Sequence, residues 1–234
     1  MSEPIVLSTS CLPDSGSVFP RFRCAGRLLC EVEPGSEVAS AVTRFIQRRF
    51  LQAYDALPNL RIPSLLALTT GHGSLLAAVG VRRASEEPLF LEDYTGRPIE
   101  QLIPSLRLPA RSEIAEIAHL AGVEVGVSRY LFPALTVWLK AEGFRWIAFT
   151  GTEQVCNSFD HLGIRIHGLG PANPARLPDG GQGWGRYYEN RPMVMAANVD
   201  EGYQVLQARR LLGRIRPWRT EGDARGAGDY DCIA

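Results

Sequence analysis

The 234-residue chain carries 25 Lys and Arg residues against 25 Asp and Glu residues, so its formal net charge is zero. A chain without an excess of either sign has no overall field toward polyanions, and we expect no nucleic-acid partner. The length suits one domain with one sizeable core.

The N-terminus shows neither a basic leader nor an apolar run typical of a secretory signal, and no stretch reaches the ~18 apolar residues of a transmembrane span. The cysteines form an odd set without a C-x-x-C pair: Cys11, Cys24, Cys30, Cys156 and Cys232. That pattern argues against a disulfide framework and a zinc site. We therefore expect free thiols, no metal and a cytoplasmic location.

The first third of the chain predicts one helix and a hairpin. Residues 1–35 lack clear periodicity and are expected to be an irregular lead-in. Ser36 can cap a helix, because apolar side chains then recur at helical spacing up to Phe50. The β-rich runs 64–70 and 74–83 are joined by Gly71-His72-Gly73, which is a hairpin signal.

The middle third predicts two short elements and then a strand followed by a helix. Residues 89–94 resemble a short strand and residues 98–106 a short helix. Residues 113–121 alternate like a strand. A helix is expected over 129–142, with Pro133 in its first turn, where the missing N–H costs little.

The remaining elements complete an α/β pattern. Residues 146–150 form an apolar run typical of a buried parallel strand, and Thr152 can cap a helix that Gly163 ends. The last part of the chain predicts a Gly/Pro-rich loop over 168–185, a strand over 193–199, a helix over 200–213 and a flexible tail over 216–234. We expect one domain over 36–215, with a mixed sheet and helices on both faces.

Five strings follow one another along this domain: AAVGVRRA (77–84), LFLEDY (89–94) with PIE (98–100), EIAHLAG (116–122), FTGTEQVCNSFDHLG (149–163) and WGRYYENRP (184–192). In this order the chain resembles the thermostable hemolysin family, which is similar in fold to GNAT acyltransferases and to autoinducer synthases. The resemblance covers roughly residues 36–200 and implies a GNAT-like α/β fold.

The resemblance also implies an activity: transfer of an acyl group from acyl-CoA, or from a phosphopantetheine-linked thioester on an acyl carrier protein, to a small-molecule amine. GNAT enzymes usually bind the pyrophosphate of CoA with a Q/R-x-x-G-x-G/A turn. Residues 123–128 read VEVGVS, without the basic residue, which favours a carrier-protein thioester or a longer acyl-CoA. Two alternatives stay open: a membrane-active haemolysin, after the family name, and a GNAT-like protein that binds a ligand or partner without catalysis.

Glu116 and His119 are the candidate catalytic residues of the strand 113–121. Strict alternation puts Glu116 among apolar neighbours on one face and His119 on the other. Burial would raise the pKa of Glu116, which suits a general base, and the resemblance implies a Glu base in this strand. The alternative is a structural carboxylate bonded to backbone or to an arginine. His119 is a second base, a group that orients the acceptor, or a structural residue.

The other candidates come from the resemblance and from loop positions. Tyr187 or Tyr188 would protonate the leaving thiolate, and the two would point opposite ways in an extended segment. A turn and helix start would bind the donor's phosphate, where free N–H groups favour anions. The residues expected to bind the acyl donor are Gly122, Gly126, Ser128, Arg129, Asn157 and Phe159, and those expected to bind the substrate are Arg82, Glu92, Thr150 and Trp184. The alternatives are a plain turn for the glycines, cap and core roles for Thr150, Asn157 and Phe159, aromatic packing for the tyrosines and a surface ion pair for Arg82 and Glu92.

Overall fold

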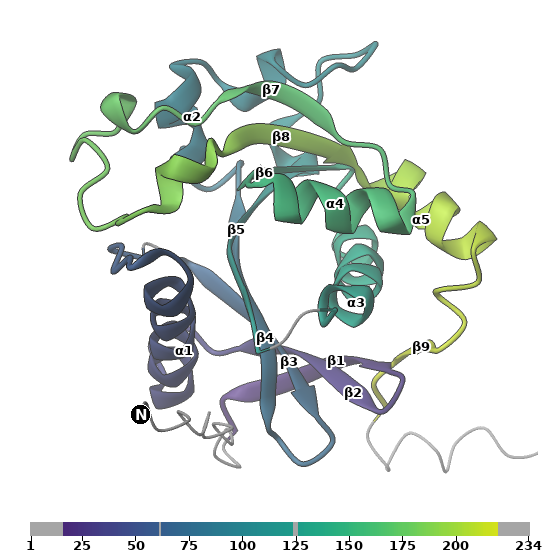
Figure 1. The fold of residues 1–234 in the computed structure, drawn as a ribbon. Coiled ribbons are helices and arrows are strands. Elements are labelled where there is room, and N and C mark those ends of the chain that lie inside the picture. The colour runs from purple at the N-terminus through teal and green to yellow at the C-terminus, as the bar shows by residue number, and fades with distance from the viewer. Residues whose placement is uncertain (1–15, 61, 124–125, 220–234) are drawn as a thin grey trace, which may run out of the picture.

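The computed structural model describes residues 16–60, 62–123 and 126–219. Their strands form one nine-stranded sheet in the order β7-β8-β6-β5-β4-β3-β2-β1-β9 (Figure 1). The strands are β1 (Val18–Cys24), β2 (Arg27–Val32), β3 (Ser64–Thr70), β4 (Leu75–Arg83), β5 (Ile114–Gly122), β6 (Trp146–Gly151), β7 (His167–Pro171), β8 (Met193–Asn198) and β9 (Ile215–Pro217). The sheet is mixed, because β5 and β6 are parallel and the other pairs are antiparallel.

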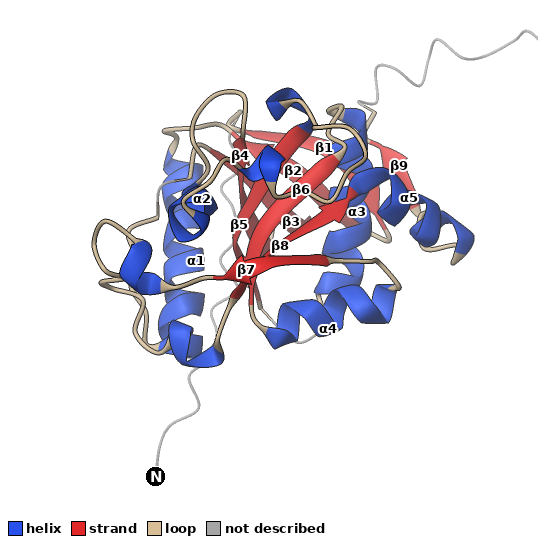
Figure 2. Ribbon diagram, turned by 90° about the horizontal axis from the view of Figure 1, so that it is seen from above, coloured by secondary structure: helices blue, strands red, loops and turns tan. Residues whose placement is uncertain are grey.

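Helices cover both faces of this sheet (Figure 2). They are α1 (Glu37–Tyr54), α2 (Phe90–Thr95), α3 (Ser128–Ala141), α4 (Glu153–Leu162) and α5 (Val199–Ala208). Side chains of α1 and α2 pack in two clusters on one face, whereas α3, α4 and α5 share the largest cluster on the other. The expected α/β class, a mixed sheet with helices on both faces, is confirmed.

Several elements predicted from local signals in the sequence are present in the structure. The Ser36 hydroxyl accepts the Ala39 N–H and caps α1, and β3 and β4 form the expected hairpin. β5, α3 and β6 form a parallel strand–helix–strand unit. Pro133 is an exception, because α3 begins at Ser128 and the proline lies inside the helix rather than in its first turn. It removes one N–H from the helical ladder.

The ends of the sheet differ from the prediction. Within the expected lead-in 1–35, β1 and β2 form a hairpin, and Pro20 sits at an irregularity of β1, which is where a strand tolerates proline. α5 ends at Ala208 rather than at residue 213. β9 then pairs with β1 across the expected boundary between the domain and the tail. Residues 1–15 and 220–234 lie outside the described residues.

Two further segments take another form than their patterns indicate. The Gly/Pro-rich loop begins with a strand, β7, that pairs with β8. Of residues 98–106, only Ile99–Gln101 is helical, as one 3₁₀ turn. Within the described residues, no helix combines the length and the apolar character needed to cross a membrane.

Most of the predicted strand 89–94 lies in helix α2, with Leu89 as its N-cap, because two carboxylates stabilise the N-terminus of the helix. Glu92 accepts the Leu89 N–H, while Glu116 of β5 accepts the N–H groups of Phe90 and Leu91. These N–H groups have no partner within the helix itself. The second carboxylate comes from a distant strand, so no local pattern could reveal it.

Candidate active site

A β-bulge interrupts β5 opposite β4. Ala78 pairs with Ala121 and Gly80 with Ala118, so His119 and Leu120 together oppose one residue of β4. His119 has a φ of 55°, a left-handed conformation that is rare for a residue with a side chain. A bulge of this kind redirects side chains and increases local twist.

The bulge overturns the predicted separation of Glu116 and His119. Glu116 bonds to the N-terminus of α2, and His119 contacts Phe50 of α1 and Trp184, with ring centroids 6.0 and 5.8 Å apart. Both side chains line the same cavity. Strict alternation would have placed them on opposite faces, but the extra residue shifts the period by one.

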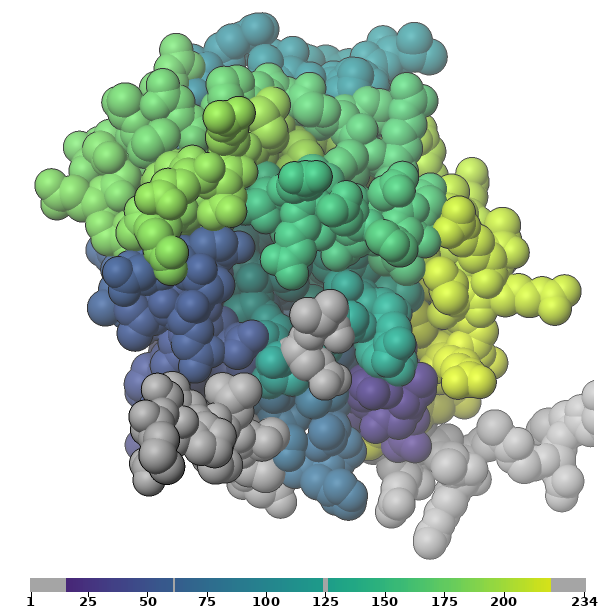
Figure 3. Space-filling model, viewed as in Figure 1, coloured from purple at the N-terminus to yellow at the C-terminus, as the bar shows by residue number. Residues whose placement is uncertain are grey.

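Two adjacent cavities meet at this part of β5. β5 and β6 pair only as far as Ile117 and Phe149, and the cavities lie where the strands part. The first, the aromatic cavity, has a volume of about 70 Å³. The second, the apolar cavity, measures about 60 Å³ between β5, β6, α3 and α4. Both are lined by Ile117, His119, Leu120, Thr150 and Val155. In Figure 3, β5 is set back between α1 and the α3–α4 side.

Glu116 is a buried, hydrogen-bonded carboxylate. Its Oε2 accepts from Arg82 Nη1 at 2.8 Å and from Phe90 N at 2.9 Å, and its Oε1 accepts from Leu91 N at 3.1 Å. Burial raises the pKa of Glu116, against the opposite effect of Arg82 and the two N–H groups. A carboxylate has about four acceptor positions, so these donors leave room for one from the cavity.

His119 lies in a site that disfavours its charged form. Burial, and the charge of Arg82 in second place, lower the pKa of His119 from 6.5 to about 4. The imidazole is therefore neutral near pH 7. It stacks on Trp184 at an interplanar angle of 25°.

This lowered pKa gives a testable pH dependence of stability. The unfolded chain binds a proton at His119 below about pH 6.5 and the folded chain only near pH 4, so stability falls as the pH drops through this window. A shift of this size corresponds to roughly 3 kcal/mol at the acid end. Urea unfolding at pH 7 and 4.5 should show a smaller loss for His119→Asn than for the wild type. Asn tolerates the left-handed backbone. Equal losses would show that His119 protonates freely in the folded protein.

The two candidate tyrosines differ in position. Residues Tyr187–Asn190 form a 3₁₀ turn rather than the extended segment assumed from the sequence. Tyr187 lines the aromatic cavity, whereas Tyr188 reaches it through Tyr94, with the two hydroxyl oxygens 2.6 Å apart. Burial raises the pKa of Tyr188 to about 12 and that of Tyr187 and Tyr94 further. All three phenols therefore remain protonated and can donate a hydrogen bond.

Trp184 enters the cavity because its loop is fastened to the end of α1. The Gly183 carbonyl accepts from Leu57 N at 2.7 Å, and Arg186 N donates to the Tyr54 carbonyl at 2.7 Å. Gly185 has a φ of 47°, and a Cβ there would lie 2.2 Å from the Asp55 carbonyl oxygen. Only glycine fits such an approach.

Thr150 lies at the junction of the cavities with its hydroxyl unsatisfied. Its Oγ1 is the buried side-chain polar atom of the described residues that has no hydrogen-bond partner. Phe159 lines the apolar cavity and stacks on Phe149 at 4.9 Å. Asn157 is exposed and lines neither cavity. Its backbone carbonyl oxygen lies 2.6 Å from His161 Nδ1. The structure thus brings Thr150 and Phe159 together but not Asn157.

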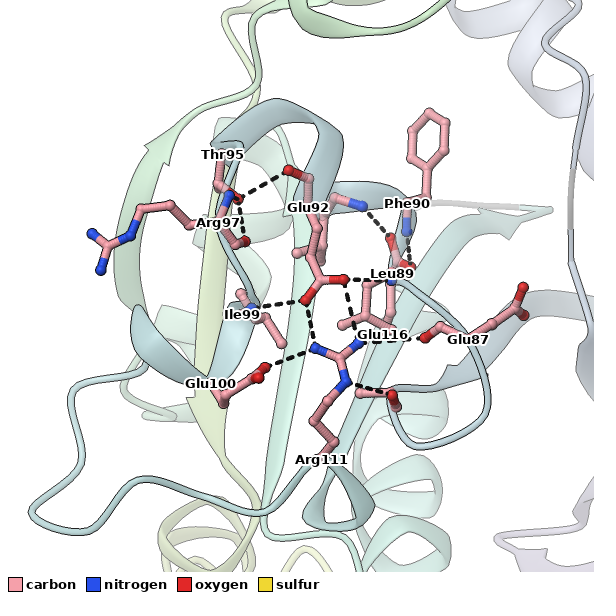
Figure 4. Close-up of polar contacts among 12 residues, drawn as sticks. Glu87, Leu89, Phe90, Glu92, Thr95, Arg97, Ile99, Glu100, Arg111 and Glu116 are labelled. Carbon is pink, nitrogen blue, oxygen red and sulfur yellow. Dashed lines mark hydrogen bonds and ion pairs between the residues drawn. The ribbon is translucent and has the colours of Figure 1, made fainter.

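Arg82 and Glu92, the two charged residues predicted to bind substrate, contact different partners. Arg82 Nε donates to Glu87 at 3.0 Å, beside its bond to Glu116. Glu92 instead accepts from Arg111 at 2.7 Å and from Ile99 N at 2.8 Å (Figure 4). Arg111 and the two N–H groups lower the pKa of Glu92 against the effect of burial. These contacts fasten the N-terminus of α2 to Arg111 and to the segment after the helix.

Arg111 was not indicated by the sequence. Its guanidinium also donates to Glu100 at 2.7 Å (Figure 4). It donates to the Ala84 carbonyl at 2.7 Å as well. It thus joins α2, the 3₁₀ turn after it and the end of β4. Sequence reasoning had no signal for it, because its partners lie 11 to 27 residues away.

The predicted phosphate turn is only partly described, since residues 124–125 lie outside the described part. Gly122 ends β5, and Gly126 has a φ of 91°. Ser128 opens α3 without a side-chain cap. Arg129 is exposed and lies over the Tyr130 ring at 4.8 Å, and Arg27 of β2 lies over the same ring at 3.6 Å. Two guanidinium groups therefore flank the start of α3, of which the sequence indicated one.

The sequence matches the family model described as thermostable hemolysin over residues 32–203. The chain belongs to the thermostable hemolysin family. A search of curated proteins by sequence found no match. Among the described residues of this family member, no three His, Cys, Asp or Glu side chains gather as ligands for a metal ion.

Solved structures share the fold at low sequence identity. FeeM, an N-acyl amino acid synthase from uncultured soil microbes, has a TM-score of 0.54 and 14% identity over 79% of this chain and 98% of its own. BjaI, a CoA-dependent acyl-homoserine lactone synthase solved with SAM and isopentyl-CoA, has a TM-score of 0.52 and 13% identity over 81% of this chain and 92% of its own. TofI in an apo form has a TM-score of 0.51 and 12% identity over 76% of this chain and 95% of its own. The hemolysin-family chain therefore has a GNAT-like fold.

Proposed function

We propose that this protein transfers an acyl group from an acyl-CoA or a phosphopantetheine-linked thioester to a small-molecule amine. The observation that carries the proposal is the meeting of two cavities at Thr150, one apolar and one lined by Glu116 and aromatic rings. Acyl transfer needs such a pair of pockets, because donor and acceptor must approach from two sides of one carbonyl carbon. The similar folds of BjaI and FeeM support this reading.

On the donor side, the apolar cavity suits the first carbons of an acyl chain. Phe132, Phe149 and Phe159 line it. The thioester carbonyl would then lie at Thr150, whose unsatisfied Oγ1 can donate to the carbonyl oxygen. Arg27 and Arg129, beside the start of α3, would bind the phosphates of CoA or of a carrier protein's phosphopantetheine.

On the acceptor side, the amine nitrogen attacks the thioester carbon, a C–N bond forms and the C–S bond breaks. The amine proton passes to Glu116, and a cavity phenol, Tyr187 or Tyr94, donates the proton that the leaving thiolate takes. Neutral His119 stacks beside the acceptor and orients it.

The direct test incubates the purified full chain with a panel of acyl-CoA and acyl-carrier thioesters and follows free thiol after amines or amino acids are added. Release that depends on the amine, together with the acylated product by mass spectrometry, is expected. Comparison of the two donor types decides between CoA and a carrier protein. Absence of amine-dependent release across the panel would refute acyl transfer.

Thr150→Val separates the role of the hydroxyl from its effect on the fold. Loss of one hydrogen bond to the donor carbonyl should lower the transfer rate roughly tenfold. Loss of an unpaired buried hydroxyl should leave stability unchanged or raise it. The matched control is Thr136→Val in the same cavity, whose hydroxyl already donates to the Phe132 carbonyl at 2.8 Å. A Thr150→Val protein with the wild-type rate would remove Thr150 from the donor site.

A further inference from the structure

The aromatic cavity has a lining that suits a positive charge. Six aromatic side chains line it, from α1, α2 and the loop before β8: Phe50, Tyr54, Phe90, Tyr94, Trp184 and Tyr187. We call these six residues the aromatic cage. Within the described part of the chain, no Lys or Arg lines this cavity, and its one carboxylate is Glu116. Aromatic faces are negative and attract cations, most strongly when water is excluded.

The rings hold one another in fixed orientations. Trp184 is the central member, with centroids 6.0 Å from Phe50, 6.1 Å from Phe90 and 5.2 Å from Tyr187. Tyr54 meets Tyr187 edge to face at 5.2 Å, and Phe90 meets Tyr94 at 90°. Rings locked by their neighbours need little rearrangement to receive a ligand, which favours binding.

The local charge agrees with this lining. Arg82 is bonded to two carboxylates, Glu116 and Glu87, so the three groups together carry a formal charge of −1. Glu116 also retains an acceptor position toward the cavity. His119 adds no charge near pH 7, because its pKa lies at about 4.

We infer that the aromatic cavity binds the acyl acceptor as a small organic cation, with its ammonium group against the aromatic cage and Glu116. The role as acceptor rests on the proposed acyl transfer; the preference for a cation rests on the cage alone. Binding as an ammonium ion brings two of its protons in turn to Glu116: the carboxylate takes the first and passes it to solvent, which leaves the free amine as nucleophile, and it then takes the second during the attack on the thioester.

The test compares choline with 3,3-dimethylbutan-1-ol, an uncharged molecule of the same shape, by calorimetry on the full chain. No thioester is present, so no acyl transfer takes place, and sodium chloride matches the ionic strength. Choline should bind at least tenfold more tightly than the alcohol. Equal affinities, or no binding of either compound, would overturn the inference.

Variants locate the site. Trp184→Leu should reduce the preference for choline to less than about threefold, whereas Trp218→Leu, which removes a tryptophan of the described chain outside the cavity, should retain it. Phe90→Leu is the second cage variant and is the one to use if Trp184→Leu fails to fold. Retained preference in a folded cage variant contradicts the assignment. Failure of thiol release with an intact preference would refute acyl transfer but not the cation site, and the reverse result would refute only the site.

Discussion

Glu116→Gln should lower the rate of amine acylation by about 10²–10⁴, the usual contribution of a positioned general base. The variant also tests more than basicity, because three donors point at the two oxygens of Glu116. A glutamine offers one acceptor oxygen, so its NH₂ group must face Arg82 or an N–H of α2. We therefore expect a loss of stability of about 1–3 kcal/mol beside the loss of rate.

A pH–rate profile separates these two effects. Without a base in the cavity, only amine that is already deprotonated reacts, so the residual rate should rise about tenfold per pH unit below the pKa of the amine. The measurement is made well below the melting temperature of the variant, with donor-induced thermal shift as the control for folding. A folded Glu116→Gln protein with the wild-type rate and profile would leave Glu116 as a structural carboxylate only and move the base to His119 or a bound water.

Arg82→Met should reduce the free energy of unfolding by about 3–5 kcal/mol, because it leaves the charge of Glu116 buried without its guanidinium. The matched control is Arg107→Met. Arg107 pairs with Glu113 at the same distance of 2.8 Å, but its side chain is 65% exposed against 7% for Arg82. Exposed pairs contribute about 1 kcal/mol or less. Urea unfolding of both variants at pH 7 gives the comparison.

The pH dependence of this loss identifies its cause. Removal of Arg82 raises the pKa of Glu116 further, since its largest lowering influence is gone. Protonation then relieves the buried charge, so the deficit of Arg82→Met should shrink as the pH falls. A deficit equal to that of Arg107→Met would show that the buried charge is compensated elsewhere.

Elements whose signals are local could be predicted from the sequence alone. The Ser36 cap, the hairpin of β3 and β4, and the β5–α3–β6 unit each depend on residues a few positions apart. These signals and the order of the five strings gave the fold class and the family. The sequence also indicates Glu116, Tyr187 and Trp184, which are buried and line the aromatic cavity.

The tertiary structure decided how those residues meet. The bulge at His119 depends on pairing with β4, and it moved His119 to the side of Glu116. α2 is a helix because a carboxylate from β5 caps it, and Trp184 enters the cavity because its loop is bonded to the end of α1. The short edge strand β9 forms only because β1, far away in the sequence, offers a strand to pair with. Each of these features depends on contacts between residues far apart in the chain, which a periodic sequence pattern does not encode. All of them lie at or beside the candidate site or at the edge of the sheet.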